Sequence, residues 1–319
     1  MDGHCFTVRR RFARLVRMAH PGGSTARQSN QPDSSAITSR ENRWLKRFRA
    51  ALSGERGEDG IVGVEGVRLV EAALGSGLPV EALLVSDSGA RHLPRVAPLL
   101  ASQVPVLHTS DKLFAGVADT KSPQGIAALV HPRQATIESL LPGTALLVAL
   151  VGVQDPGNVG TIIRAAEAFG ATGAATCPSD SVGTADPFAP KALRASAGSA
   201  LRLPIVHGVS STILMAQLRM FHVTIYAAVA ATEEFAQQAS DKASAFLRPW
   251  DIDWKIPAAI LIGNEGSGLP AELVRAADAR VYIPQAETTA RVGIESLNAA
   301  MAASVLLYEA MRQRSSGRK

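Results

Sequence analysis

The fold is decided by the stretch ALLVALVGVQDPGNVGTIIRAAEAF, residues 145–169. Residues 145–153 form an almost continuous aliphatic run, which is typical of a strand with both faces buried. The sequence DPGN at 155–158 consists of turn-forming residues, and Asn158 stands where a helix N-cap is expected. Residues 159–169 have the apolar spacing of a helix. The stretch therefore predicts a strand, a tight turn and a helix, which together are the repeating unit of α/β proteins.

The same alternation continues to the C-terminus and predicts a domain over residues 144–319. Because its strands are aliphatic throughout, we expect a parallel sheet covered by helices on both faces. Residues 232–253 are polar and predict a surface loop or short helix. The predicted strands cover residues 145–153, 173–176, 202–206, 223–228, 258–262 and 280–283, and the predicted helices cover residues 159–169, 186–200, 210–220, 270–277 and 294–312.

The N-terminal part predicts a smaller α/β/α domain at 40–132 and a linker at 133–143. Its predicted strands cover residues 60–66, 80–85, 104–107 and 126–130, and its predicted helices cover residues 67–74 and 93–102. Residues 1–39 are first Arg-rich and then rich in Gly, Ser, Gln and Pro, which predicts a disordered basic tail. Three interpretations of this tail stay open: a dispensable start with Met18 as the true first residue, an RNA-contacting tail, or an organelle transit peptide.

Composition narrows the class of protein. The length of 319 residues fits two domains, and the net charge of +5 favours a polyanionic partner such as nucleic acid. Cys5 and Cys177 are the only cysteines, too far apart in sequence for a disulfide framework or a metal site. No apolar run approaches the roughly 20 residues of a membrane span. We therefore expect a cytoplasmic protein with no metal and no membrane segment.

A basic segment at 40–49 has two interpretations. It carries five Arg and Lys side chains, with Trp44, Leu45 and Phe48 between them. It is either a solvated helix face whose apolar residues pack inward, or an RNA contact that combines phosphate binding with base stacking. The side chains that would make the RNA contact are Arg43, Lys46 and Arg47.

A glycine-rich motif, GNEGSG at 263–268, follows the apolar run that ends at Ile262. Its glycines let the backbone turn tightly and approach a ligand closely. The order differs from the GxGxxG of dinucleotide sites, and the chain has no GxxxxGK phosphate loop. An acid among glycines is unusual in a simple turn. We interpret Glu265 either as part of a structural turn or as a partner for a ribose, an amino group or an arginine.

A third motif, ESLN at 295–298, opens the last predicted helix. Ser296 fits an ordinary helix cap, and Asn298 fits an early helix position. An apolar stripe then follows helical spacing, and it predicts intramolecular core, a dimer interface, or both. The stripe consists of Leu297, Met301, Val305 and Tyr308.

In this order and spacing, the three motifs resemble those of the SpoU (TrmH-type) RNA ribose 2′-O-methyltransferases, over residues 145–313. KALRASAG at 191–198 and RLP at 202–204 also resemble this family. VEGVRLV at 64–70 and TKSPQG at 120–125 resemble the L30e-like substrate-binding domain of its rRNA-directed members. The resemblance implies an α/β SPOUT domain with a deep trefoil knot, S-adenosylmethionine as cofactor, a homodimer, and ribosomal RNA as the substrate.

The resemblance also assigns roles to residues. In-line methyl transfer to a 2′-hydroxyl requires alignment and assisted deprotonation. Arg164 is interpreted as a phosphate clamp, because a guanidinium is a poor base. The implied catalytic residues are Asn158, Arg164, Glu265, Ser296 and Asn298; the implied cofactor-binding residues are Ile262, Gly263, Asn264, Gly266, Ile283, Pro284 and Leu297; and the candidate RNA-binding residues are Arg43, Lys46, Arg47 and Arg194.

One segment departs from the family pattern. Residues 285–294 form a loop about twice the usual length, with Gln285 where the family commonly has Met. We expect this loop either to act as a lid over the cofactor or to block or reshape its pocket. Two other functions stay open: the same reaction on tRNA, and a noncatalytic RNA-binding or ribosome-assembly role. A generic Rossmann enzyme has less support, because the fingerprint is missing.

Overall fold

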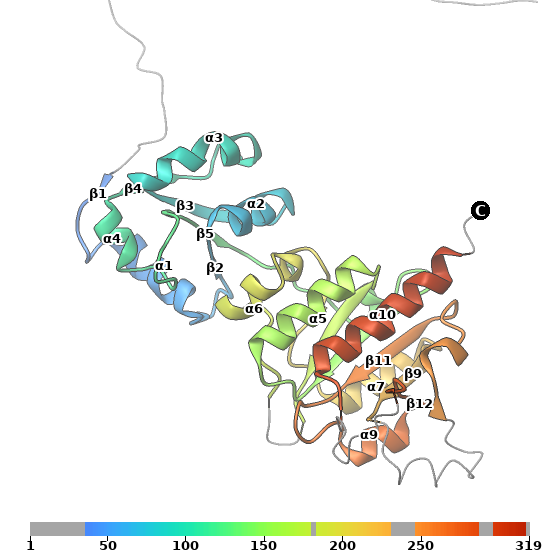
Figure 1. Cartoon of the computed structure of the whole chain (residues 1–319). Helices are drawn as coiled ribbons and strands as arrows, with labels where there is room; N and C mark the ends of the chain where they lie inside the picture. The colour runs from blue at the N-terminus through green and yellow to red at the C-terminus, as the bar shows by residue number, and fades with distance from the viewer. Residues whose placement is uncertain (1–35, 180–182, 231–245, 287–295, 317–319) are drawn as a thin grey trace, which may run out of the picture. The chain divides into compact units, whose positions relative to one another are not determined.

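The computed structural model describes residues 36–179, 183–230, 246–286 and 296–316, which form two β-sheets with flanking helices (Figure 1). Several predictions therefore lie outside the described residues. They concern the tail before residue 36, the loop at 287–294, the first residues of the helix predicted at 294–312, and residues 232–245.

The N-terminal sheet has five strands in the order β1-β4-β3-β5-β2. β5 runs antiparallel to both β2 and β3, whereas β3 and β4 are parallel. Helices α1 and α2 pack on opposite faces, because their buried residues belong to different core clusters. The strands are β1 (Ala36–Ile37), β2 (Val62–Glu65), β3 (Val80–Ser86), β4 (Val106–Thr109) and β5 (Ile126–Val130), and the helices are α1 (Arg43–Ser53), α2 (Val67–Gly75), α3 (Leu93–Val96) and α4 (Asp111–Ala115).

Prolines explain two differences from the predicted elements of this sheet. The helix predicted at 93–102 ends early, with α3 followed by a 3₁₀ turn at Ala97–Leu99. Pro98 has no N–H for a helical hydrogen bond, and its ring crowds the preceding turn. The strand predicted at 104–107 lies at Val106–Thr109 instead, directly after Pro105, which cannot donate to a strand ladder.

The C-terminal sheet has seven strands, all parallel, in the order β10-β12-β9-β11-β6-β7-β8. β6 and β11 are adjacent, with Ala258 opposite Leu146, and every residue of both strands is buried. This agrees with the parallel sheet predicted from continuous aliphatic runs. The strands are β6 (Leu146–Val151), β7 (Gly173–Cys177), β8 (Ile205–Val206), β9 (Thr224–Ala228), β10 (Phe246–Leu247), β11 (Ala258–Ile262) and β12 (Ala279–Val281).

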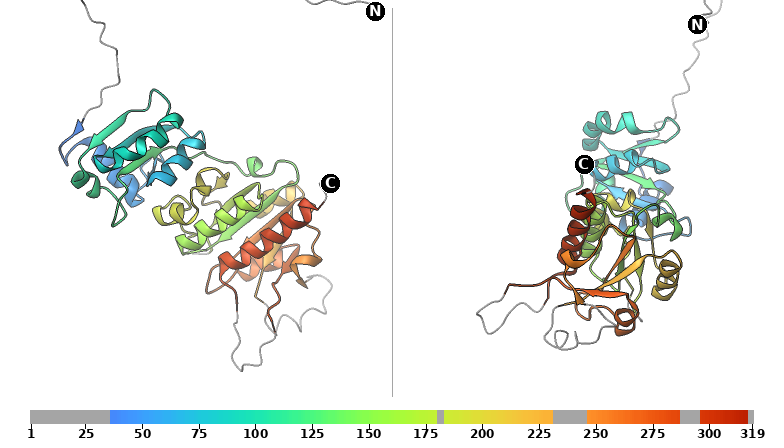
Figure 2. Two further views of the ribbon diagram at one scale, coloured as in Figure 1. Left: turned by 45° about the horizontal axis from the view of Figure 1, so that its top comes forward. Right: turned by 90° about the vertical axis from the view of Figure 1, so that its right-hand side faces the viewer.

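Helices cover both faces of this sheet. α5 (Pro156–Ala168) and α10 (Ala299–Ser315) lie side by side on one face, where they share a core with Leu146 and Ile260 (Figures 1 and 2). α7 (Ser211–Met220) and α9 (Ala271–Ala276) pack on the other face, against Leu147 and Leu261. Successive strand residues thus point to opposite faces, as the two-residue period of a strand requires. None of the described helices combines the length and apolarity that a membrane crossing needs.

The helix predicted at 186–200 is shorter in the structure. α6 (Pro190–Ala195) begins at a proline, which suits the first position of a helix. Ala197 and Gly198 then both have positive φ, of 49° and 82°, and a 3₁₀ turn follows at Ser199–Leu201. These left-handed residues end the helix, because an α-helix cannot continue through them.

The order of the strands creates a crevice. The chain leaves β6 towards β7 on one side, and it leaves β11 towards α9 and β12 on the other. Connections that diverge from neighbouring parallel strands leave a ligand-binding crevice outside the carboxyl ends of those strands. The DPGN motif follows β6 after three residues, and the GNEGSG motif directly follows β11. The fold therefore brings two motifs together that are more than a hundred residues apart in sequence.

Candidate active site

A chain of side-chain hydrogen bonds joins the three motifs. Asn298 Nδ2 donates to Asn158 Oδ1 at 3.1 Å, and Asn158 Nδ2 donates to Glu265 Oε1 at 2.9 Å. One residue of each motif takes part. The predicted polar residues Asn158, Glu265 and Asn298 therefore lie in direct contact.

The caps of the two helices differ from the prediction. Asp155, and not Asn158, caps α5, because Pro156 fits the first helical position and Asp155 Oδ1 accepts from Gly157 N at 3.0 Å. Asn158 sits in the first turn, where its amide is free to bond across the site. Asn298, and not Ser296, caps α10, and its Oδ1 accepts from the N–H groups of residues 300 and 301 at 2.9 and 3.3 Å.

Glu265 contacts protein groups rather than standing open for a substrate. Its two oxygens also accept from the backbone N–H groups of Gln154 and Asp155, both at 3.2 Å. Burial alone would raise the pKa of Glu265, but the hydrogen bonds from Asn158 and the backbone outweigh it and hold the pKa below its ordinary value. Glu265 is therefore an ionised acceptor that fixes the turn after β6.

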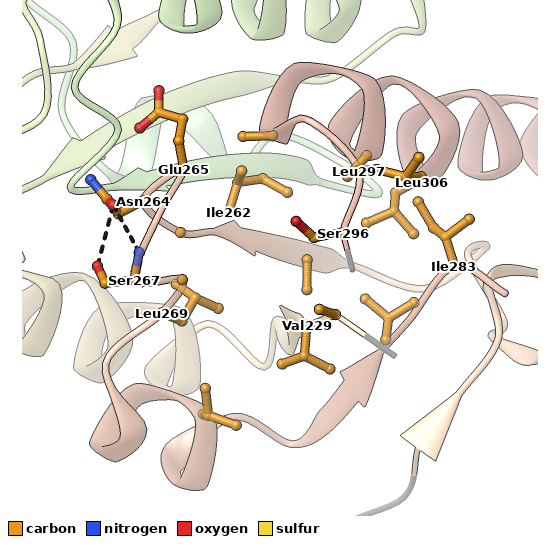
Figure 3. Close-up of a pocket in the computed structure, with 18 of the residues that line it drawn as sticks. Val229, Ile262, Asn264, Glu265, Ser267, Leu269, Ile283, Ser296, Leu297 and Leu306 are labelled. Atoms are coloured by element: carbon orange, nitrogen blue, oxygen red, sulfur yellow. Dashed lines mark hydrogen bonds between the residues drawn. The ribbon is translucent and has the colours of Figure 1, made fainter. Parts of the chain in front are cut away.

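Asn264 holds the glycine-rich loop closed. Its Oδ1 accepts from Gly266 N at 2.9 Å and from Ser267 N at 3.0 Å, and Figure 3 shows Asn264 bonded to Ser267. Its Nδ2 donates to Gly152 O at 2.8 Å. Gly263 permits the closure, because a Cβ there would lie 2.3 Å from the carbonyl carbon of Gly268. The loop is thus tied both to itself and to the end of β6.

A cavity of about 400 Å³ opens beside this loop. Figure 3 shows Ile262, Ile283, Leu297 and Leu306 around it, with Ser296 between them. Its size falls in the range of small-molecule sites. Six of the seven residues predicted to bind the cofactor line this cavity, together with the predicted catalytic residues Glu265 and Ser296; Pro284 is not among the lining residues. The six are Ile262, Gly263, Asn264, Gly266, Ile283 and Leu297.

Sequence reasoning missed other residues that line the cavity. Val229 follows β9, the strand next to β11, so it stands at the same edge of the sheet. Leu306 lies two turns inside α10 and reaches the cavity from the face packed on the sheet. The apolar composition of both segments was visible in the sequence, but the adjacency of β9 and β11 was not. Among the described residues, no group of His, Cys, Asp or Glu is placed to hold a metal ion.

Arg164 is exposed on α5 and has no ion-pair partner within the described ranges. Glu167, one turn further along the same helix, does not pair with Arg164. Glu167 instead accepts two hydrogen bonds from Arg202, both at 2.7 Å. The guanidinium of Arg164 is therefore available to an anionic ligand.

The basic face of α1 is largely engaged in ion pairs. Arg47 contacts both Asp59 and Glu81 at 2.7 Å, and Lys46 contacts Glu41 at 2.6 Å. Arg43 lies over the ring of Trp44. Leu45 and Phe48 are buried, as the packing interpretation predicted. Arg194, the fourth candidate RNA contact, lies on α6 with 43% of its side chain exposed.

The apolar stripe begins at Leu297, which lines the cavity just before α10, and continues along the exposed side of that helix. Its four members, Leu297, Met301, Val305 and Tyr308, are 37–64% exposed. The helix instead packs inward through a different face, formed by Ala300, Ala303, Leu306, Leu307 and Ala310. The interpretation of the stripe as intramolecular core is therefore wrong. An exposed apolar stripe of this length is typical of a protein interface.

Comparison with known proteins assigns the family. The profile of the SpoU rRNA methylase family matches residues 145–308, and that of the MRM3-like substrate binding domain matches residues 50–128. An uncharacterized tRNA/rRNA methyltransferase of Synechocystis is 34% identical over 88% of this chain and 95% of its own. The 23S rRNA (guanosine(2553)-2′-O)-methyltransferase RlmP of Bacillus subtilis is 32% identical over 85% of this chain and 97% of its own.

A solved structure agrees with the sequence relatives. The AdoMet-bound rRNA methyltransferase from Sinorhizobium meliloti matches with a TM-score of 0.70 and 31% identity, covering 87% of this chain and 97% of that one. Fold and sequence together define an RNA methyltransferase of the SPOUT type. The chain belongs to the SpoU rRNA methylase family.

Proposed function

We propose that the protein transfers a methyl group from S-adenosylmethionine to a ribose 2′-hydroxyl of 23S-type ribosomal RNA. The observation that carries the proposal is the hydrogen-bonded chain from Asn298 through Asn158 to Glu265, beside a cavity of about 400 Å³. Membership of the SpoU family supports it, as does similarity to RlmP, which is named for 2′-O-methylation in 23S rRNA. The match to a substrate-binding domain at 50–128 favours rRNA over tRNA.

The lining of the cavity fits S-adenosylmethionine. Ile262, Ile283 and Leu297 offer apolar surface for an adenine ring, and Gly263 and Gly266 let the backbone approach a ligand closely. When bound, S-adenosylmethionine supplies a methyl group on a sulfonium, which is already a good leaving group. The remaining tasks for the protein are to align the hydroxyl and to stabilise its developing charge.

The asparagines are suited to stabilising that charge. Asn158 and Asn298 each use one Nδ2 hydrogen within the chain, and an amide nitrogen carries two. The second hydrogens can donate to the ribose oxygen as it becomes negative, in the manner of an oxyanion hole. Glu265 does not act as the general base, because its oxygens already accept three hydrogen bonds and its pKa is depressed. It is the fixed acceptor at the end of the chain.

Arg164 then binds the RNA backbone. It lies six residues after Asn158 on the exposed side of α5 and carries a guanidinium that matches a phosphate in two-pronged geometry. Holding the phosphate next to the target ribose positions the hydroxyl and lowers its pKa. Ser296, at the cavity, orients the cofactor or the hydroxyl.

The proposal also covers the oligomeric state of the protein, its domains and its location. The exposed stripe on α10 packs against a second copy of the chain, giving a homodimer. Residues 40–132 form the RNA-binding domain, 144–319 the methyltransferase domain and 133–143 the linker between them. The trefoil knot implied by the family stays a prediction. We place the protein in the cytoplasm, where ribosomal RNA is modified.

Two measurements test the function. Calorimetry should show saturable S-adenosylmethionine binding that Glu265→Ala weakens. Methyl transfer to 23S rRNA fragments and to tRNA is then followed with labelled cofactor, and the labelled nucleotide is mapped by its resistance to alkaline cleavage. Label at a ribose of the rRNA supports the proposal. Label on tRNA alone would favour the tRNA reaction, and RNA binding without any cofactor binding would favour a noncatalytic role.

A further inference from the structure

Lys191 reaches the active site from a second helix. It lies in the first turn of α6, and its Nζ contacts the carboxylate of Asp155 at 2.5 Å. Asp155 caps α5 and donates its own backbone N–H to Glu265. Lys191 is therefore two contacts away from the chain that joins the three motifs, although none of the three contains it.

The close packing of α5 against α6 brings Lys191 to this position. A Cβ on Gly160 would lie 2.3 Å from a backbone oxygen of α6, so only glycine lets α5 and α6 pack this closely. A Cβ on Gly157 would stand 3.5 Å from Cε of Lys191. The lysine stem thus runs over the first turn of α5, where the substrate-facing Asn158 also lies.

The charges around the start of α5 favour a cation at the position of Lys191. Asp155 and Glu265 place two carboxylates around the start of α5, and the pKa of each is held below its ordinary value, so both are ionised at neutral pH. For Asp155 the largest cause of the lowered pKa is the hydrogen bond from Lys191. Two negative charges would repel the phosphates of an incoming RNA strand. Lys191 offsets one of them, and 62% of its side chain stays exposed.

We propose that Lys191 binds an RNA phosphate beside the target nucleotide and, together with Arg164, fixes the strand over the active site. This inference rests on the proposed function. Gly157 and Arg164 are seven residues apart, so they share one face of α5 at a separation of about 10 Å. An ammonium over the first turn and a guanidinium two turns along it can therefore hold two different phosphates of one strand. Asp155 uses one N–H of the ammonium, which leaves two to donate to phosphate oxygens.

Different results are expected if the ion pair between Lys191 and Asp155 is purely structural. An exposed pair of this kind contributes little to stability, since solvent screens it. If Lys191 only supported the cap of α5, its loss would lower the melting temperature slightly and leave RNA affinity unchanged. A phosphate contact instead changes RNA affinity and its dependence on salt, and it leaves cofactor affinity unchanged.

The test compares Lys191→Gln and Lys191→Arg with Lys255→Gln in the full chain. Lys255 is an exposed lysine before the amino end of β11, away from the carboxyl ends that carry the site. The probe is a fluorescent 23S rRNA fragment, with affinity measured by anisotropy at several salt concentrations. Methyl-transfer kinetics on the same fragment and cofactor calorimetry accompany it.

We expect Lys191→Gln to weaken RNA binding and raise KM about tenfold, and to reduce the salt slope by about 0.7, the value for one phosphate of a single strand. Cofactor affinity should stay unchanged, Lys191→Arg should restore most of the binding, and Lys255→Gln should behave as wild type. Unchanged RNA affinity and salt slope in Lys191→Gln would overturn the inference. If the wild type binds RNA but never methylates it, the proposed function fails, and the affinity measurements still decide the role of Lys191.

Discussion

Replacing Glu265 with glutamine tests whether the hydrogen-bonded chain positions the catalytic groups. All the hydrogen bonds in the chain run in the same direction, from donor to acceptor towards residue 265. Asn298 Oδ1 must accept from the N-terminus of α10, so its Nδ2 must donate to Asn158, whose Nδ2 must in turn donate to residue 265. Only a group without hydrogens can end such a chain while also accepting from two backbone N–H groups. Glutamine keeps the shape of glutamate but turns one acceptor into a donor.

The cost follows from which oxygen accepts which bond. Oε1 accepts from Asp155 and Asn158, and Oε2 accepts from Gln154. In its best orientation the glutamine oxygen replaces Oε1. The side-chain NH₂ group then replaces Oε2 and faces the backbone N–H of Gln154, so the bond to Gln154 is lost. The two bonds that remain lose their charge assistance. Because residue 265 is partly exposed, we expect a loss of about 1–2 kcal/mol, below the full value for buried charged hydrogen bonds.

Three measurements check this expectation. The melting temperature should fall by roughly 2–8 °C, given the 2–4 °C per kcal/mol typical of domains of this size. With Asn158 no longer held, kcat on an rRNA fragment should fall about 10- to 100-fold, as expected when reacting groups are misplaced by about 1 Å. Glu272→Gln, at an exposed carboxylate on α9, is the matched control and should change neither value appreciably.

The pH dependence gives a further check on the same variant. The pKa of Glu265 is lowered from 4.5 in the folded protein, so its ionised form is favoured by folding. The stability difference between wild type and Glu265→Gln should be complete above about pH 4.5 and should shrink as the pH falls through the lower folded value. A variant with wild-type stability and wild-type kcat at neutral pH would refute the chain as a positioning device.

Other predictions concern the packing, the thiol and the interface. Gly160→Ala should destabilise the fold by about 1–3 kcal/mol in urea unfolding, because its Cβ would lie 2.3 Å from a backbone oxygen of α6, whereas Gly75→Ala, with open space around it, should not. The pKa of the buried Cys177 is raised to about 12 by burial, so in a Cys5→Ser background a thiol reagent should label the protein only after unfolding. Light scattering should find the wild type as the proposed dimer and Met301→Glu as a monomer, and a dimer of Met301→Glu would exclude the α10 stripe as the interface.

The sequence predicted local features well because each carried its own chemistry. The aliphatic runs indicated the parallel sheet, and the glycines at 263–268 indicated a tight loop beside a ligand. The predicted helix caps were wrong where two residues that both favour an N-cap lie close together in the sequence. Asp155 and Asn158 both suit an N-cap, and Pro156 decides between them because it fits only the position after the cap. That signal was present in the sequence.

The contacts between the motifs could not be predicted from the local sequence, and the reason is physical. Glu265 finds its partners more than a hundred residues away, and it does so only because β11 inserts beside β6. Nothing in either strand specifies that neighbour, since all the strands are similarly aliphatic. Sequence reasoning therefore left two interpretations of Glu265, as part of a structural turn or as a partner for a ribose, an amino group or an arginine. Its partners in the structure are an asparagine amide and two backbone N–H groups.

The direction of the chain also explains why these residue types stand where they do. The N-terminus of α10 and the turn after β6 both present N–H donors. Each group between them must therefore accept from one neighbour and donate to the next, and the last group must only accept. Asparagine can accept and donate at once, which suits Asn298 and Asn158, and a carboxylate only accepts, which suits Glu265. An aspartate at position 158 would face Glu265 with like charge and would lose the donor that we propose for the ribose oxygen. The amides thus satisfy the fold and the proposed chemistry with the same atoms.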